Sequence, residues 1–232
     1  EEAFQDALLY YYTAIFSPFK PYVIKAINKI NDLKLDMVCT GHGPVLDTRI
    51  DEIIETYRNW STPAKKEGPK KVVMPYVSAY GYTGELAEAI TKGIHEVDPT
   101  IQVIPYNLDI LNYPQKKDEI LAHFADADGI LLGTCTINGD ALPIIWDLSI
   151  HLNPIVHGGK IVSAFGSYGW SGEGVDNIMD RLNQLRMKVI DGFKIKFRAS
   201  ESETQAAIDF GKLFANSLLT GKVPARKKET GA

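Results

Sequence analysis

The chain has 232 residues, 45% of them hydrophobic and 23% charged, and a formal net charge of -4. These values are typical of a soluble globular protein, long enough for one domain with an additional segment. The acidic balance argues against nucleic acid or an anionic membrane as the main partner, and no apolar run is long enough to span a bilayer. There is no signal-peptide pattern, and the two cysteines, Cys39 and Cys135, should lie in different domains. The sequence therefore predicts a cytoplasmic protein without a disulfide framework.

The first part of the chain, residues 1–62, is expected to be mainly helical. Hydrophobic spacing and prolines predict three helices, at residues 1–16, 22–33 and 49–60. Between the second and third helices, a short buried strand is expected at residues 36–40 and a turn at residues 41–44. The first helix carries a dense aromatic patch made of Tyr10, Tyr11, Tyr12 and Phe16. This part has too little apolar surface for a core of its own.

A polar and charged stretch that contains two prolines, residues 63–70, predicts an inter-domain linker. Beyond it, apolar runs alternate with amphipathic runs as far as residue 220, and residues 221–232 form a charged tail. The expected strands lie at 71–77, 101–106, 129–133, 160–165 and 188–197, with a break allowed at 191–192. The expected helices lie at 84–95, 115–124, 142–152, 175–185 and 201–219. This alternation predicts an α/β fold in residues 71–220, with a five-stranded parallel sheet covered on both faces. We expect this sheet to be doubly wound with the strand order 2-1-3-4-5, which is one of the common orders of such folds.

The first expected strand leads into a short hydroxyl-rich loop, from Ser78 to Thr83. This loop lacks the lysine of a nucleotide-triphosphate loop and the glycines of a dinucleotide fingerprint. Thr83 is well placed to cap the following helix, and free N–H groups at a helix start attract an anion. The loop therefore predicts a site for a phosphate monoester, held by N–H groups and hydroxyls without a cation. The alternative is an ordinary strand–turn–helix connection.

Two more loops are expected at the same edge of the sheet, because ligands of such folds bind at the carboxyl ends of strands where the order reverses. They span residues 133–140 and 166–172 and are rich in glycine and small polar side chains. Tyr168 and Trp170 could stack on a flat ring, or Trp170 could fill a gap over the sheet. The pair Asn138–Gly139 tolerates positive φ, so its peptide could offer either C=O or N–H to a ligand. Its alternative is a hairpin turn without a cofactor contact.

Together these motifs resemble the flavodiiron proteins, also called A-type flavoproteins. Ser78, Gly81 and Thr83 are similar to the flavodoxin phosphate loop, with Tyr80 in place of a threonine, and residues 136–140 and 166–172 are similar to the family's other flavin loops. The resemblance implies FMN, with its phosphate at the first loop and its ring between the other two. Cys135 replaces an expected proline, and its small apolar side chain favours packing over redox chemistry. The cofactor-binding residues implied in this way are Ser78, Ala79, Tyr80, Gly81, Tyr82, Thr83, Thr134, Cys135, Thr136, Ile137, Asn138, Gly139, Ser167, Tyr168, Gly169, Trp170 and Gly172.

The resemblance also extends to the first part of the chain. The family places a metallo-β-lactamase-like domain before its flavodoxin-like domain, and residues 1–62 resemble the end of that domain. His42 would then be the last histidine of a diiron site, but the family's His-x-Glu-x-Asp-His motif is not found in this sequence, and its nearest imitation, residues 95–98, ends a helix of the other domain. His42 is thus expected to bind metal, and diiron to be present, only if the missing half is supplied. The other isolated histidines are expected to be surface or capping residues, namely His123, His151 and His157.

The chain begins at Glu1 without a methionine, and we expect it to be the carboxyl-terminal portion of a longer flavodiiron protein. The resemblance implies an FMN-binding electron-transfer module of an O₂ or NO reductase, supplied by rubredoxin or another reductase and assembled as a head-to-tail homodimer. No catalytic residue is assigned to this chain, so whether it is an enzyme depends on the missing half. The alternatives are one chain of a split or cleaved flavodiiron enzyme, a stand-alone FMN-dependent quinone reductase, and a cofactor-free interaction domain that uses the aromatic patch.

Overall fold

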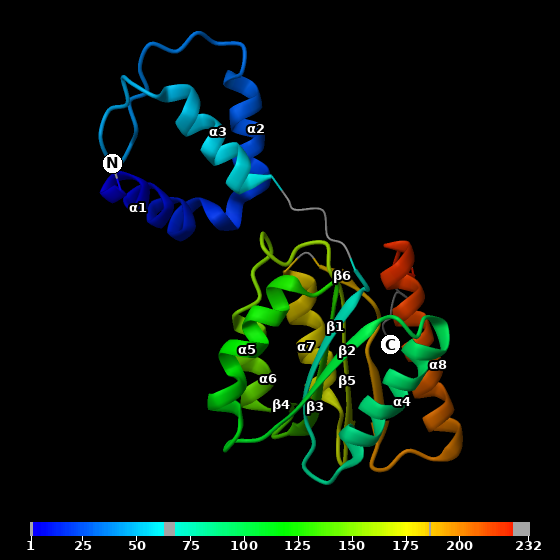
Figure 1. The fold of residues 1–232 in the computed structure, drawn as a ribbon. Helices are drawn as coiled ribbons and strands as arrows, with labels where there is room; N and C mark the ends of the chain where they lie inside the picture. The colour runs from blue at the N-terminus through cyan, green and yellow to red at the C-terminus, as the bar shows by residue number, and fades with distance from the viewer. Residues whose placement is uncertain (1, 63–67, 186, 225–232) are drawn as a thin grey trace, which may run out of the picture. The chain divides into compact units, whose positions relative to one another are not determined.

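The structure is a computed structural model that describes residues 2–62, 68–185 and 187–224 (Figure 1). Its internal contacts divide the chain into two compact units, an N-terminal unit of residues 1–67 and a C-terminal unit of residues 68–232. Residues 63–67 of the predicted linker and residues 225–232 of the predicted tail lie outside the described residues.

The N-terminal unit is mainly helical, as expected. Helix α1 (Glu2–Tyr11) continues through a π-helical turn, η1 (Tyr12–Phe16), and a 3₁₀ turn, η2 (Ser17–Phe19), into α2 (Lys20–Ile30). A third helix, α3, spans Ile50–Ser61. Pro18 and Pro21 lie in the first turns of η2 and α2. The N–H group that proline lacks would have no acceptor within the helix at these positions, so proline costs no hydrogen bond there. The prolines therefore set the break between the first two helices.

The buried strand expected at residues 36–40 is not formed. Val38 and Leu46 make an isolated antiparallel bridge, with N···O distances of 2.8 and 2.9 Å, while Met37 and Cys39 are exposed. A strand needs a neighbouring strand to satisfy its N–H and C=O groups, and the described part of this unit offers no pairing beyond that bridge. The segment is consequently irregular.

The aromatic patch of the first helices is partly internal. Tyr12 is buried, its hydroxyl lies 2.8 Å from Ser61 Oγ, and its ring packs against those of Tyr57 and Trp60 on α3. Tyr10, by contrast, is 76% exposed. The patch therefore serves first to hold α3 against the start of the chain.

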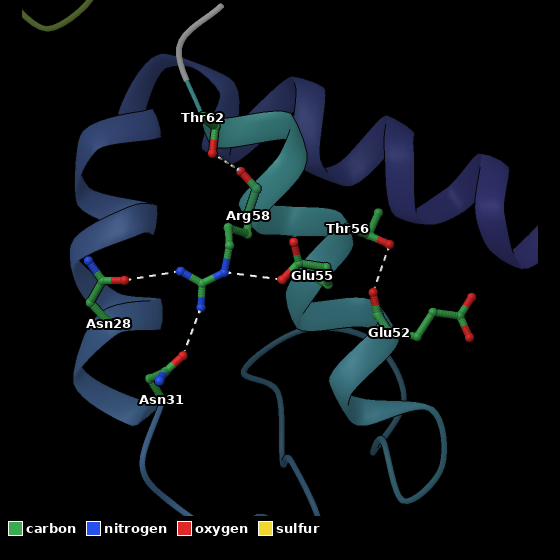
Figure 2. Close-up of polar contacts among 7 residues, drawn as sticks. All are labelled: Asn28, Asn31, Glu52, Glu55, Thr56, Arg58 and Thr62. Carbon is green, nitrogen blue, oxygen red and sulfur yellow. Dashed lines mark hydrogen bonds and ion pairs between the residues drawn. The ribbon is translucent and has the colours of Figure 1, made fainter.

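One guanidinium fixes α3 against α2 (Figure 2). Arg58 donates from Nη1 to Asn28 Oδ1 at 3.1 Å and from Nη2 to Asn31 Oδ1 at 3.0 Å, while its Nε donates to Glu55 at 3.2 Å. The planar fork suits this arrangement because it reaches several acceptors at once. The buried apolar side chains described in this unit are few, namely Tyr12, Val23, Ile27 and Ile50, which agrees with the small core expected from the sequence.

The C-terminal unit contains the predicted parallel sheet. Its strands are β1 (Lys71–Val77), β2 (Gln102–Leu108), β3 (Gly129–Ile137), β5 (Ile161–Tyr168), β6 (Lys188–Val189) and β7 (Phe193–Lys196). The order is β2-β1-β3-β5-β6, and β7 also pairs with β5. Since β6 and β7 are the two halves of one predicted strand, broken at 191–192, the predicted order 2-1-3-4-5 is confirmed.

Helices cover both faces of this sheet (Figure 1). Helices α4 (Tyr82–Val97) and α8 (Glu201–Thr220) pack on one face through a cluster that includes Val72, Phe165 and Phe214. Helices α5 (Tyr113–Asp126), α6 (Pro143–Ile150) and α7 (Glu173–Gln184) pack on the other through a cluster that includes Ile130 and Ile178. This is the doubly wound α/β arrangement. No helix of the described residues is both long and apolar enough to cross a membrane.

Two central strands run further than the sequence suggested. β3 continues to Ile137 because Thr136 and Ile137 pair with a short antiparallel strand, β4 (Asp140–Ala141). β5 continues to Tyr168 because its end pairs with β7, up to Tyr168 opposite Lys196. The expected loops at 133–140 and 166–172 are therefore partly strand, since tertiary pairing extends the ladders into polar sequence.

The two edges of the sheet carry features that interrupt a hydrogen-bonding ladder. β2 has Pro105 at its centre, opposite Met74 of β1. The other edge is divided into the two short strands β6 and β7, and the exposed side chains of β7 include Lys194 and Lys196.

Candidate functional site

The loop after β1 ends in a left-handed glycine that starts α4. Gly81 has φ 88° and occupies the N-cap position, so the helix begins at Tyr82. The prediction that Thr83 caps this helix is wrong, because the glycine turns the chain two residues earlier. Ser78 Oγ accepts the N–H of Gly84 at 3.0 Å. The N–H groups of Tyr82 and Thr83 lie in the first turn, where a helix offers no acceptor, and the helix dipole adds positive charge there.

The side chain of Thr83 joins the three strand ends that the sequence singled out. Thr83 is fully buried, and its hydroxyl lies 2.9 Å from Ser167 Oγ on β5 and 3.5 Å from Cys135 Sγ on β3. The Cys135 thiol in turn donates to Val77 O at the end of β1, at 3.5 Å. The loops after β1, β3 and β5 therefore start from one small group of polar side chains at the carboxyl edge of the sheet.

The second loop is a tight β-hairpin. Asn138 and Gly139 both have positive φ, 52° and 73°, and connect Ile137 to Asp140. Two consecutive left-handed residues form a type I′ turn, which matches the twist of the flanking strands. Ile137, Asn138 and Gly139 are exposed. The structure thus has a hairpin turn here, and it presents the tip of that hairpin at the same sheet edge as the loop after β1.

Asp140 anchors this hairpin to two helices. Its Oδ1 accepts hydrogen bonds from Asn177 Nδ2 on α7 at 2.8 Å, from Trp146 Nε1 on α6 at 2.9 Å and from its neighbour Ala141 N at 2.7 Å. The bond from Asn177 is the main cause that lowers the pKa of Asp140, and those from Trp146 and Ala141 add to it against the opposing effect of burial. Asn177 and Trp146 were not predicted, since nothing in their local sequence marks them.

The third loop presents an exposed aromatic side chain. Trp170 is 95% exposed, so it does not fill a gap over the sheet, and Tyr80 of the first loop is 86% exposed. Tyr168 is half-buried at the end of β5, with its ring directly over Gly172, where an added Cβ would lie 2.9 Å from it. The backbone of Gly169 similarly lies against Phe197, which an added Cβ would approach to 3.1 Å.

Two threonines on β3 brace the site. Thr134 Oγ1 accepts the N–H of Leu142 at 3.1 Å, and Thr136 Oγ1 accepts the N–H of Gly174 at 3.2 Å. All the residues that the sequence assigned to the cofactor lie in or next to the three strand ends at this edge; among them, Ala79 is exposed in the first loop.

A cation that the sequence reading missed lies beside the start of α4. Arg198, two residues beyond β7, pairs with Glu85 in the first turns of α4, with N···O distances of 3.0 Å for both Nε and Nη2. The hydrogen bond to Glu85 raises the pKa of Arg198. The position of Arg198 at the carboxyl end of the last strand could have indicated that it lies near the site. The first turns of α4 are thus next to a cation, although Glu85 offsets its charge.

The histidines show no metal centre. His42 is exposed, with its ring centroid 6.4 Å from that of Tyr11. Among the residues that the structure describes, no group of three or more His, Cys, Asp and Glu side chains could hold a metal ion, so these residues do not fit a diiron site. His123 and His151 hydrogen-bond to Tyr106 and to the Asp147 carbonyl, whereas His157 is buried and accepts the N–H of Asn153. His157 therefore supports a loop, and is not a surface residue.

A parallel sheet of this order, with three loops meeting at its carboxyl edge, defines a flavodoxin-like α/β protein, and comparison with known proteins agrees. The family model described as Flavodoxin matches residues 75–211. The chain is 40% identical over 223 residues to Flavo-diiron protein FprA2 of Clostridium acetobutylicum, covering 94% of this chain and 53% of the relative. It is 32% identical over 212 residues to the anaerobic nitric oxide reductase flavorubredoxin of Vibrio vulnificus, covering 90% and 42%.

Among solved structures, rubredoxin oxygen:oxidoreductase of Desulfovibrio gigas aligns with a TM-score of 0.64 and 21% identity, over 91% of this chain and 52% of that one; at this identity the likeness shows the fold alone. The chain belongs to the flavodoxin family, and its resemblance to the flavodiiron, or type A, flavoproteins extends over almost its whole length. It spans about half the length of the curated relatives it matches.

The flavodoxin family and these relatives imply FMN as the cofactor. The described residues fit it. The free N–H groups at the start of α4 suit a phosphate, as a helix N-terminus does in general. The exposed rings of Tyr80 and Trp170, together with the hairpin tip at Asn138 and Gly139, offer flat surfaces and backbone polar groups to a ring system.

Proposed function

We propose that this chain is the FMN-binding electron-transfer module of a flavodiiron-type oxidoreductase. The observation that carries the proposal is the contact of the Thr83 hydroxyl with Ser167 and Cys135, which ties the three loops to one place. FMN would supply the one- and two-electron chemistry, and the protein would supply orientation and electrostatics. The N–H groups of Tyr82 and Thr83 would hold the phosphate, and the loops after β3 and β5 would flank the ring.

The partners are proposed by analogy with the relatives. The names of two of them refer to rubredoxin and to the reduction of oxygen or nitric oxide. We propose that electrons reach the flavin from rubredoxin or a similar reductant and pass to a diiron centre, which the described residues do not provide, in a head-to-tail homodimer. Purified chain should then contain bound flavin but less than stoichiometric iron. Two tightly held irons per chain, with no second polypeptide in the sample, would contradict this.

FMN binding can be tested by titrating the flavin-free chain and following quenching of flavin fluorescence. Riboflavin, which lacks the phosphate, should bind at least about tenfold more weakly, because it forgoes charge-assisted hydrogen bonds worth about 1.5–3 kcal/mol. Thr83→Ala should weaken FMN binding by about tenfold, because it breaks the junction of the three loops. Thr91→Ala is the matched control, since Thr91 lies on the same helix and its hydroxyl donates to the Ala87 carbonyl of that helix at 2.7 Å.

The outcome of this titration separates the alternatives. Equal affinity for FMN and riboflavin would refute the phosphate site, and uptake of neither flavin would favour an interaction domain without a cofactor. Rapid bleaching of the bound flavin by NADH without a mediator would instead favour a quinone reductase.

A further inference from the structure

The loop after β5 is held at its first residue by a side chain from the end of the neighbouring strand. Phe197 directly follows β7, and its backbone N–H donates to the carbonyl oxygen of Tyr168 at 2.7 Å. The Phe197 ring lies against the backbone of Gly169, where an added Cβ would come within 3.1 Å of it. Phe197 therefore covers the point at which the loop that carries the exposed Trp170 leaves the sheet.

The other end of this loop is held from the same strand. Lys194 of β7 donates from Nζ to the carbonyl oxygen of Gly172 at 3.0 Å. Only two residues, Trp170 and Ser171, lie between Gly169 and Gly172. The short stretch of backbone that carries the Trp170 ring is thus fixed on both sides, by β7 and by the residue that follows it.

The backbone at Phe197 is unfavourable for its own side chain. Phe197 has φ 62°, in the left-handed region that bulky side chains avoid. Its side chain is 57% exposed and belongs to neither of the two hydrophobic clusters of the described residues, so core packing does not account for it. Backbone strain of this kind is concentrated at active sites and ligand-binding sites. The contact that the phenylalanine ring provides in return is the one with Gly169.

We propose that Phe197 is a positioning residue that holds Gly169, so that Trp170 is presented to the flavin ring in one orientation. This inference rests on the proposed function, in which the loop after β5 flanks the ring. A tryptophan on an unrestrained loop would lose conformational freedom when it stacks on a ligand, and that loss would weaken binding. Because Phe197 fixes the loop before the flavin binds, the strain in its backbone replaces that loss.

The test is a double-mutant cycle of Phe197→Gly and Trp170→Ala, in which the flavin-free full chain is titrated with FMN. Glycine suits the left-handed backbone, so Phe197→Gly removes the ring without adding strain. With Trp170 present, Phe197→Gly should raise the dissociation constant of FMN about tenfold, because the loop is no longer fixed before binding. In the Trp170→Ala background it should raise this constant less than about twofold, because residues that act through one another are not additive.

Two further variants serve as controls. Arg49 is also left-handed, with φ 56°, but precedes α3 in the N-terminal unit, so Arg49→Gly should change the dissociation constant of FMN less than about twofold. Phe197→Tyr keeps the ring and should bind FMN as the unmodified chain does.

Equal effects of Phe197→Gly with and without Trp170 would overturn the proposal, and so would an unchanged affinity when Trp170 is present. Phe197→Asn is a second variant, because asparagine adopts the left-handed region but lacks the ring, and it should show the same coupling. Circular dichroism checks the fold of each variant. Loss of the fold in both would give Phe197 a purely structural role and would also overturn the proposal. An unmodified chain that takes up no FMN would instead refute the proposed function, and this inference with it.

Discussion

At the scale of single residues, Asp140 shows how one carboxylate holds distant elements together. Three donors, from α6, α7 and the backbone of β4, meet at its Oδ1. A carboxylate that accepts several hydrogen bonds is stabilised in its charged form, which accounts for its lowered pKa. The group is therefore at once a structural anchor of the hairpin and a source of acid sensitivity.

We expect Asp140→Ala to lower the free energy of unfolding by about 1–3 kcal/mol at pH 7, because Trp146 Nε1 and the Asn177 amide lose their acceptor. Urea denaturation followed by circular dichroism measures this change. Asp118→Ala on the surface of α5 should change stability by less than about 0.5 kcal/mol. The folded pKa of Asp140 lies below the ordinary carboxyl value of 3.8, so its stabilisation is present above that value and is lost as the pH falls through the folded pKa. A loss in Asp140→Ala no greater than in Asp118→Ala would contradict this.

His157 gives a second pH dependence, of the same sign but near neutrality. Burial, and then the charge of Lys160, lowers the pKa of His157 from 6.5, so the folded state favours the neutral ring. Below pH 6.5 the unfolded chain binds the proton more readily, and the free energy of unfolding should therefore fall as the pH drops toward the lowered folded pKa. His157→Gln should show a flatter profile between pH 7.5 and 5 in urea titrations. An unchanged slope would show that other groups set the acid sensitivity in this range.

At the scale of elements, α4 and α8 approach each other through two glycines. A Cβ on Gly93 would lie 1.9 Å from the Ile208 carbonyl oxygen, and one on Gly211 would lie 2.2 Å from that of Ile90. These atoms belong to helical backbone and cannot move aside as a flexible side chain would. The two helices thus depend on glycine at their crossing, even though glycine is a poor helix former.

Gly93→Ala should therefore destabilise the C-terminal unit by about 1–3 kcal/mol, as overpacked sites do. Helix propensity alone predicts the opposite, a gain of about 1 kcal/mol. Thermal unfolding of this variant decides between the two effects. Asn216→Ala, on the exposed face of α8, serves as the control and should stay within about 0.5 kcal/mol of the unmodified chain. A stabilised Gly93→Ala protein would mean that the helices can separate at little cost.

Element order could be predicted from the sequence, whereas the ends of several elements could not. Alternation of apolar runs with amphipathic runs sufficed for a parallel sheet with helices on both faces, and the break at 191–192 was marked by its own Asp-Gly pair. The extension of β3 through Ile137 depends on pairing with β4, whereas the described part of the N-terminal unit pairs the 36–40 segment only through the bridge of Val38 with Leu46. Both outcomes are decided by tertiary contacts, which local hydrophobic spacing does not indicate.

The same division applies to the site. Its loops were recognisable because glycine and small polar residues follow each central strand. The contacts among Asp140, Trp146 and Asn177 were not, because they join residues up to 37 positions apart on helices whose rotation the sequence does not fix. Arg198 was missed for a related reason, since its partner Glu85 lies 113 residues away.

At the scale of the whole molecule, both large hydrophobic clusters lie in the C-terminal unit. Residues 68–232 expressed alone should therefore fold and, if the proposed function holds, bind FMN with a dissociation constant within about threefold of the full chain, a difference below about 0.7 kcal/mol. Circular dichroism and FMN titration of this fragment test the expectation. A fragment that is unfolded, or that binds FMN far more weakly than the full chain, would show that the N-terminal unit contributes to the fold or to the site.

The composition of the two outer strands has a consequence for self-association. A proline replaces one backbone donor at the middle of β2, and on the opposite side the ladder is short, interrupted and lined by lysines. Such features discourage a foreign strand from adding to a sheet. Concentrated solutions of the C-terminal unit should therefore resist growth into fibrils through their sheet edges.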